Sequence, residues 1–109
     1  MKSIALMFLI VFILLTVTPV FAGDAAAGRD LFGKKCASCH GASGEGKDAI
    51  AKTFKVEMRN LGSKEVQAKS DADFKKVMMD GTGKMKGVKD IDAKGTDDIV
   101  TYLRTFAKK

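Results

Sequence analysis

The residues best suited to chemistry are two cysteines and a histidine, in the run Cys36-Ala37-Ser38-Cys39-His40. On a helical turn, thiols three residues apart lie on the same side and can meet the two vinyl groups along one edge of a haem. The histidine that follows directly is carried beneath the ring, where its imidazole can reach the iron. We therefore predict one haem c per chain, bound covalently through Cys36 and Cys39 and ligated by His40.

Three other uses of this C-x-x-C-H run have to be weighed. A thioredoxin-like redox pair has the same cysteine spacing, but it requires a β-α-β context that the sequence does not offer. A structural zinc site requires four ligands, whereas two cysteines and one histidine supply three. A plain disulfide between Cys36 and Cys39 stays open if the chain is exported to an oxidising compartment, although it gives no reason for His40 to follow.

A second axial ligand decides what kind of haem protein this is. The single histidine excludes ligation by two imidazoles, so methionine is the remaining common soft ligand. Met78 falls on an apolar helical stripe with Phe74, which favours core packing. Met85 stands in a loop flanked by Gly83 and Gly87 that is free to bend toward iron. The candidates after residue 22 are Met58, Met78, Met79 and Met85.

The number of filled positions on the iron separates two functions. With both axial positions filled, the iron cannot bind oxygen or peroxide without losing a ligand, and one-electron transfer remains. An open sixth position would instead give a haem enzyme or a protein that binds gas or peroxide. We favour the electron carrier over the enzyme.

The elements that must position these residues belong to one domain. The chain has 109 residues, 46% hydrophobic and 29% charged, which excludes a disordered chain and a membrane protein with several spans. No long alternating pattern predicts a strand, so we expect an all-α fold with four or five short helices joined by glycine-rich loops. The first four helices are expected at residues 24–35, 47–53, 63–69 and from Ser70 to the glycines at 81 and 83.

The last helix has a clear end and two candidate starts. Ile99, Tyr102, Leu103 and Phe106 share one face, which predicts an end near residue 106. Asp92 could cap the helix at its start. Gly95 argues instead for a later start capped by Thr96.

The first helix with Gly28-x-x-Leu31-Phe32, the C-x-x-C-H run and the aromatic last helix together resemble the small class I monohaem cytochromes c of the bacterial soluble type. The resemblance covers the chain after residue 22 and is weakest at residues 54–69. It implies the cytochrome c fold around one haem, with Gly28 meeting Tyr102 where the end helices cross. It also implies a soluble one-electron carrier with Met85 as sixth ligand, because the family's ligand methionine lies on a loop before the last helix.

The sequence departs from that family in three places. Lys86 stands where a proline commonly follows the ligand methionine, and no proline follows the haem motif. We therefore expect a backbone carbonyl of residues 44–51 to accept the ring N–H of His40, since an imidazole ligand needs such a partner to fix its orientation. The family's common propionate-binding Trp is missing, and Arg59, Asn60 or a nearby lysine are the candidates to replace it.

The first 22 residues read as a secretory signal peptide. Lys2 precedes an unbroken apolar run from Ile4 to Leu15, and Val20-Phe21-Ala22 has the spacing of a cleavage site. An uncleaved membrane anchor is the alternative. We expect residues 23–109 to form the cytochrome c domain, a monomer in the periplasm without stable membrane insertion; a thylakoid lumen is the second choice.

Lysines flank the two segments that would hold the haem. The chain has a net charge of +6, and a positive surface steers acidic partners. We expect redox-partner proteins with acidic docking surfaces. Nucleic acid is not expected as a partner, because the few aromatic residues cannot provide stacking platforms. The flanking lysines are Lys34, Lys35, Lys84, Lys86 and Lys89.

Overall fold

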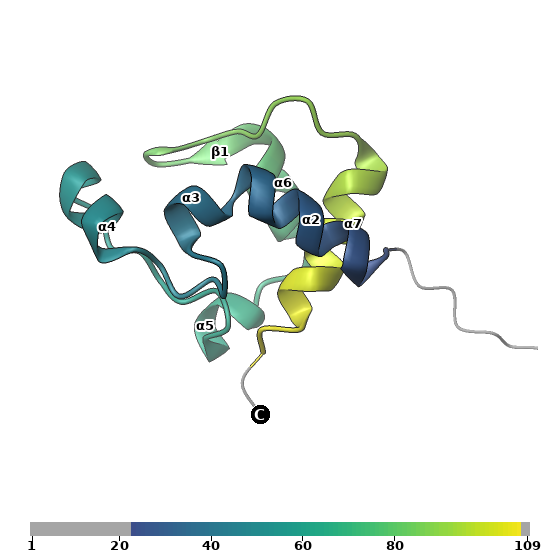
Figure 1. Cartoon of the computed structure of the whole chain (residues 1–109), viewed down its shortest axis with the longest axis horizontal. Helices are drawn as coiled ribbons and strands as arrows, with labels where there is room; N and C mark the ends of the chain where they lie inside the picture. Colours follow the sequence, from purple (N-terminus) through teal and green to yellow (C-terminus); the bar gives the residue numbers. More distant parts are fainter. Residues whose placement is uncertain (1–22, 108–109) are drawn as a thin grey trace, which may run out of the picture.

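The computed structural model describes residues 23–107, and helices account for most of their regular structure (Figure 1). The expected signal peptide, residues 1–22, lies outside this range. The described elements are α2 (Ala25–Lys35), α3 (Ala37–His40), α4 (Asp48–Phe54), α5 (Lys64–Gln67), α6 (Asp71–Asp80), β1 (Gly81–Thr82), β2 (Met85–Lys86) and α7 (Ala93–Arg104). The all-α prediction is confirmed, with the short α3 as a helix beyond the five that the sequence located.

Side chains cap α2, α5 and α6 at the starts that the sequence predicts. Asp24 accepts hydrogen bonds from the backbone N–H groups of Ala26 and Ala27 at the start of α2. Ser63 accepts from the N–H of Val66 in α5, and Ser70 accepts from the N–H of Asp73 in α6. These contacts satisfy N–H groups that a helix start leaves without partners, which is why the starts could be located from the sequence.

Of the two candidate starts of α7, the structure has the earlier one. Asp92 is the N-cap, and its carboxylate accepts a hydrogen bond from the N–H of Gly95 at 2.7 Å. The argument from Gly95 for a later start is therefore wrong. A Cβ at position 95 would lie 2.8 Å from a side-chain carbon of Ile91 and 3.3 Å from one of Leu31. The glycine is thus in the helix because its neighbours leave no room for a side chain.

Helices α2 and α7 cross and form the centre of the fold (Figure 1). At the crossing Gly28 is buried, and a Cβ there would overlap the Asp98 carbonyl and lie 3.0 Å from Cβ of Tyr102. The expected meeting of Gly28 and Tyr102 is confirmed. Beside it, the Phe32, Tyr102 and Phe106 rings contact one another edge to face, with centroids 4.9–5.5 Å apart. This crossing fixes the end of α2, from which the haem motif follows directly.

Asp98 is a buried acid that links the start of the described chain to α7. Its carboxylate accepts hydrogen bonds from the Asp24 N–H and from Nζ of Lys94, both at 2.8 Å. The Lys94 hydrogen bond, followed by the one from Asp24, lowers the pKa of Asp98. The carboxylate is therefore charged at neutral pH, and two donors compensate its burial.

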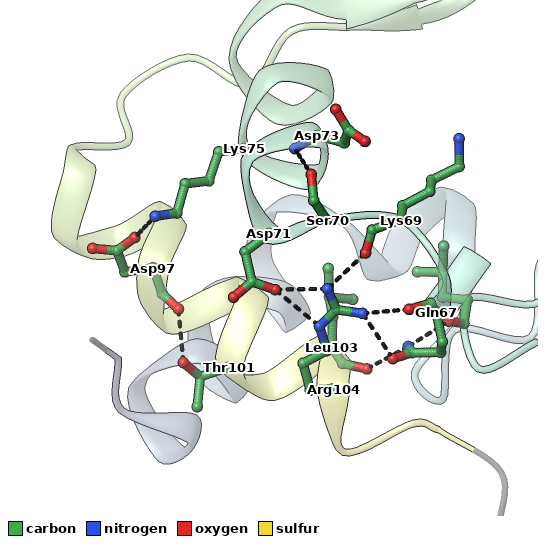
Figure 2. Close-up of polar contacts among 11 residues, drawn as sticks. Gln67, Lys69, Ser70, Asp71, Asp73, Lys75, Asp97, Thr101, Leu103 and Arg104 are labelled. Atoms are coloured by element: carbon green, nitrogen blue, oxygen red, sulfur yellow. Dashed lines mark hydrogen bonds and ion pairs between the residues drawn. The ribbon is translucent and has the colours of Figure 1, made fainter. Parts of the chain in front are cut away.

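Arg104 joins α7 to α5 and α6 (Figure 2). Its guanidinium donates to the carboxylate of Asp71 at 2.6 and 3.0 Å and to the backbone carbonyls of Gln67 and Lys69, each at 2.7 Å. The same group lies 4.6 Å from the centre of the Phe74 ring. A planar guanidinium can make these contacts at once because its five donors point in fixed directions.

A hairpin of β1 and β2 follows α6, where the sequence predicts only a loop. The strands are antiparallel, with Thr82 opposite Met85. Gly81 ends α6 with φ +78°, and Gly83 turns the chain with φ +54°, conformations that glycine adopts without strain. The N–H of Val88 donates to the carbonyl of Met78 at 2.7 Å, which ties the hairpin back onto α6. Strands of two residues are too short to show an alternating pattern.

Candidate functional site

The structure brings Cys36, Cys39 and His40 together on one turn at the end of α2. Cys36 is both the last cap of α2 and the first cap of α3. The Cys36 carbonyl accepts hydrogen bonds from the N–H groups of Cys39 at 3.2 Å and His40 at 3.0 Å. Both cysteines are free thiols. The turn on which the sequence prediction depends is thus present, and the α2–α7 crossing supports it.

The environment of Cys36 differs from that of a redox-active cysteine. Its side chain belongs to the buried core. Burial, and then the neighbouring Cys39, raise the pKa of Cys36 to about 11. The thiol therefore stays protonated at neutral pH, whereas redox-active C-x-x-C pairs lower the pKa of the attacking thiol. Together with the helical context, this weighs against a thioredoxin-like use of the pair.

His40 ends α3 as a half-buried, uncharged imidazole. Burial lowers its pKa, so the ring is neutral at neutral pH, the form that ligates a metal. Its Nδ1 atom is buried and has no hydrogen-bond partner among the described residues. The carbonyl of residues 44–51 that was expected to accept from this ring is therefore not found. Within that loop, the carbonyls of Gly44 and Lys47 accept instead from the N–H groups of Leu61 and Ala51.

The glycine-rich loop after His40 folds back onto the haem motif. The N–H of Gly46 donates to the His40 carbonyl at 2.7 Å, and the N–H of Lys47 donates to the Cys39 carbonyl at 3.2 Å. Gly41, Gly44 and Gly46 have φ between +70° and +84°. Left-handed backbone of this kind lets the loop reverse direction within a few residues. The loop leads into α4, which lies on the far side of α3 from α2 (Figure 1).

The four candidate methionines after residue 22 have different surroundings. Met78 is buried in the apolar core with Phe74, in agreement with its interpretation as core packing. Met79 is 51% exposed. Met58 is half-buried, and its Cβ lies 3.0 Å from where a Cβ of Gly46 would be. Met85 is half-buried in β2, on an element separate from the motif.

The donor set fits a covalent haem better than it fits a metal ion alone. Among residues 23–107, no group of three or more His, Cys, Asp or Glu side chains is arranged to hold a metal ion. Two free thiols and an unpartnered imidazole nitrogen on one turn suit a haem. Two surface hollows of about 400 and 310 Å³ are not lined by Cys36, Cys39, His40 or Met85.

Residues 25–107 match the family model described as Cytochrome c. The chain belongs to the Cytochrome c family. The predicted family is thereby confirmed, and family membership implies covalent haem c, for which Cys36 and Cys39 have the required spacing. The family also supports a haem electron carrier.

Two solved structures are similar to this cytochrome c chain. The KustC0563 c-type cytochrome has a TM-score of 0.63 and 25% sequence identity, over 74% of this chain and 98% of that chain. A chain of the sulfane dehydrogenase SoxCD from Paracoccus pantotrophus has a TM-score of 0.55 and 23% identity, over 77% of this chain. The match spans 43% of that SoxCD chain, and it concerns the fold alone. No curated protein sequence matches the chain significantly.

The lysines around the motif lie on segments that approach each other. Nζ of Lys35, at the end of α2, is 3.5 Å from the Lys89 carbonyl beyond the hairpin. Lys34, Lys84 and Lys86 are exposed.

Within residues 23–107, no helix is both long and apolar enough to cross a membrane. From the sequence, Asp98 and Lys84 each read as an ordinary surface charge. The burial of Asp98 and the hydrogen bond from Lys84 to the Phe54 carbonyl were therefore missed.

Proposed function

We propose that this cytochrome c is a soluble one-electron carrier whose haem is held by Cys36 and Cys39 and ligated by His40 and Met85. The observation that carries the proposal is the placement of both thiols and the neutral imidazole on a single turn. Bound haem supplies the change between Fe(II) and Fe(III). A thioether as second axial ligand favours Fe(II) and raises the reduction potential.

The chain's own residues bind and orient the group. Cys36 and Cys39 supply the sulfurs of two thioether links, and the α2–α7 crossing holds the turn that carries them. Met85 is favoured over Met78 because Met78 is buried in the core, and over Met79 because that side chain is 51% exposed on α6. Met85 follows the haem motif on a segment before the last helix, which is the order that the family resemblance implies. A haem ligated by both His40 and Met85 would leave no position for oxygen or peroxide, and one-electron transfer would remain.

The setting of this carrier is part of the same proposal. Residues 1–22 act as a cleaved signal peptide, and residues 23–109 function as a monomeric domain in the periplasm. The exposed lysines beside the motif steer redox partners with acidic docking surfaces toward the haem. The contact between Lys35 and Lys89 supports this steering, because it brings the end of α2 and the segment after the hairpin together and so gathers their positive charges. Such steering weakens as salt is added, since the screening length falls to about 8 Å at physiological ionic strength.

The test compares Met85→Ala with Met78→Ala in the haem-loaded protein. Met85→Ala should open the iron, lower the reduction potential and create weak peroxidase activity, because the thioether ligand is lost. Met78→Ala should keep the low-spin spectrum and lose about 2–5 kcal/mol of stability, as expected for a truncated core side chain. An unchanged spectrum and potential in Met85→Ala would exclude this ligand and make Met58 the next candidate. An open iron in the unmutated protein would favour the enzyme alternative.

A further inference from the structure

The tip of the hairpin is fastened to the end of α4. Nζ of Lys84, in the turn between β1 and β2, donates a hydrogen bond to the backbone carbonyl of Phe54 at 2.8 Å. Within the described range, this is the only hydrogen bond or ion pair that joins residues 48–58 to a segment outside residues 47–58. Figure 1 shows the hairpin reaching past α3 toward the side on which α4 lies.

The end of α4 is a favourable place for a lysine. The last carbonyls of a helix have no partners within it, and the C-terminal end of the helix dipole attracts a positive charge. Lys55 ends α4 in the left-handed conformation, φ +54°, with its N–H bonded back to Ala51 and Lys52. The carbonyl of Phe54 is thereby left free for a donor from another segment, and Lys84 supplies it.

This contact closes a ring of chain around the proposed site. From His40 the chain runs through the glycine-rich loop, which is bonded to the motif, into α4. Lys84 then connects α4 to the hairpin. Met85 follows Lys84 directly, and consecutive Cα atoms are about 3.8 Å apart. An anchor at Lys84 therefore limits how far Met85 can move from the segment that carries His40.

We propose that Lys84 is a positioning residue, whose contact with Phe54 holds the hairpin closed and keeps Met85 at the iron. This inference rests on the proposed ligation by Met85. Loss of one exposed, charge-assisted hydrogen bond should raise the population of open hairpin roughly three- to tenfold, because such a bond is worth about as much as one factor of ten in an equilibrium. Access of an external ligand to the iron should rise by the same factor.

The experiment measures the rate at which imidazole binds to the oxidised, haem-loaded protein. Lys84→Met removes the donor and keeps the aliphatic stem, and Lys84→Arg retains a donor. Lys86→Met is the matched control. Lys86 is exposed and follows Met85 in the sequence, and its replacement removes one positive charge, as Lys84→Met does. We expect a three- to tenfold faster rate for Lys84→Met only. Amide hydrogen exchange at Val56 and Val88, which anchor the two segments, should accelerate in the same variant.

The outcomes separate this inference from the proposed function. If imidazole binds Lys84→Met and Lys86→Met at equal rates while Met85→Ala has lost its sixth ligand, Lys84 has no positioning role. The proposed electron carrier is then unaffected. An unchanged spectrum in Met85→Ala overturns the ligation and this inference together. Faster imidazole binding in Lys84→Met, restored by Lys84→Arg, supports the inference.

Discussion

Gly28→Ala should destabilise the protein although alanine is the better helix former. In α2 the gain in helix propensity is about 1 kcal/mol. The new Cβ, however, would overlap the Asp98 carbonyl and lie 3.0 Å from Cβ of Tyr102. The carbonyl is backbone of α7 and cannot rotate away, so the two helices have to separate. Overpacking costs typically 1–3 kcal/mol. Because the obstacle is a fixed backbone carbonyl, we take the upper end, about 3 kcal/mol, and after the gain in propensity we expect a net loss of about 2 kcal/mol.

Gly33→Ala in the same helix is the matched control. Gly33 is exposed, and nothing lies within 4 Å of the Cβ that it would acquire. The propensity term then acts alone and should stabilise the protein by about 0.5–1 kcal/mol. Thermal unfolding of the haem-loaded protein should show a Tm lower by roughly 8–16 °C for Gly28→Ala and a slightly higher Tm for Gly33→Ala. Equal Tm changes of the same sign would refute the close crossing of α2 and α7.

Two further predictions concern the buried acid and the haem links. Asp98→Asn should destabilise the protein more at pH 7 than at pH 3. The folded-state pKa of Asp98 is lowered, so its contribution is fully present above the ordinary pKa of about 3.9 and is lost as the pH falls through the folded-state pKa. Urea unfolding at both pH values measures the gap from wild type, and a gap independent of pH would contradict the role of the carboxylate. Replacing both Cys36 and Cys39 by Ala should abolish native side-chain packing, because haem stabilises the native state by binding it. Near-UV circular dichroism and thermal unfolding measure this effect. Cooperative unfolding of the haem-free variant like that of wild type would argue against it.

The local features of the fold were predictable because their causes are local. Asp24 and Ser70 cap helices through hydrogen bonds to residues two or three positions ahead. The C-x-x-C-H run depends on one helical turn, and the sequence spacing already determines which side chains share a face. The family followed from this run together with the glycine and aromatic residues of the end helices. Each of these inferences needs only the periodicity of a helix and the chemistry of nearby side chains.

Other features depend on contacts between distant segments, which no local pattern specifies. Gly95 reads as a helix breaker, yet it lies inside α7 because Ile91 and Leu31 occupy the space of a side chain. Asp98 reads as a surface acid, and only the crossing of α2 and α7 buries it beside the Asp24 N–H. Lys84 reads as one more exposed lysine until the fold brings it to the end of α4, thirty residues earlier in the chain. The sequence by itself determined the chemistry of the haem motif, whereas the partners of these three residues were decided by tertiary packing, since burial and long-range hydrogen bonds are properties of the assembled chain.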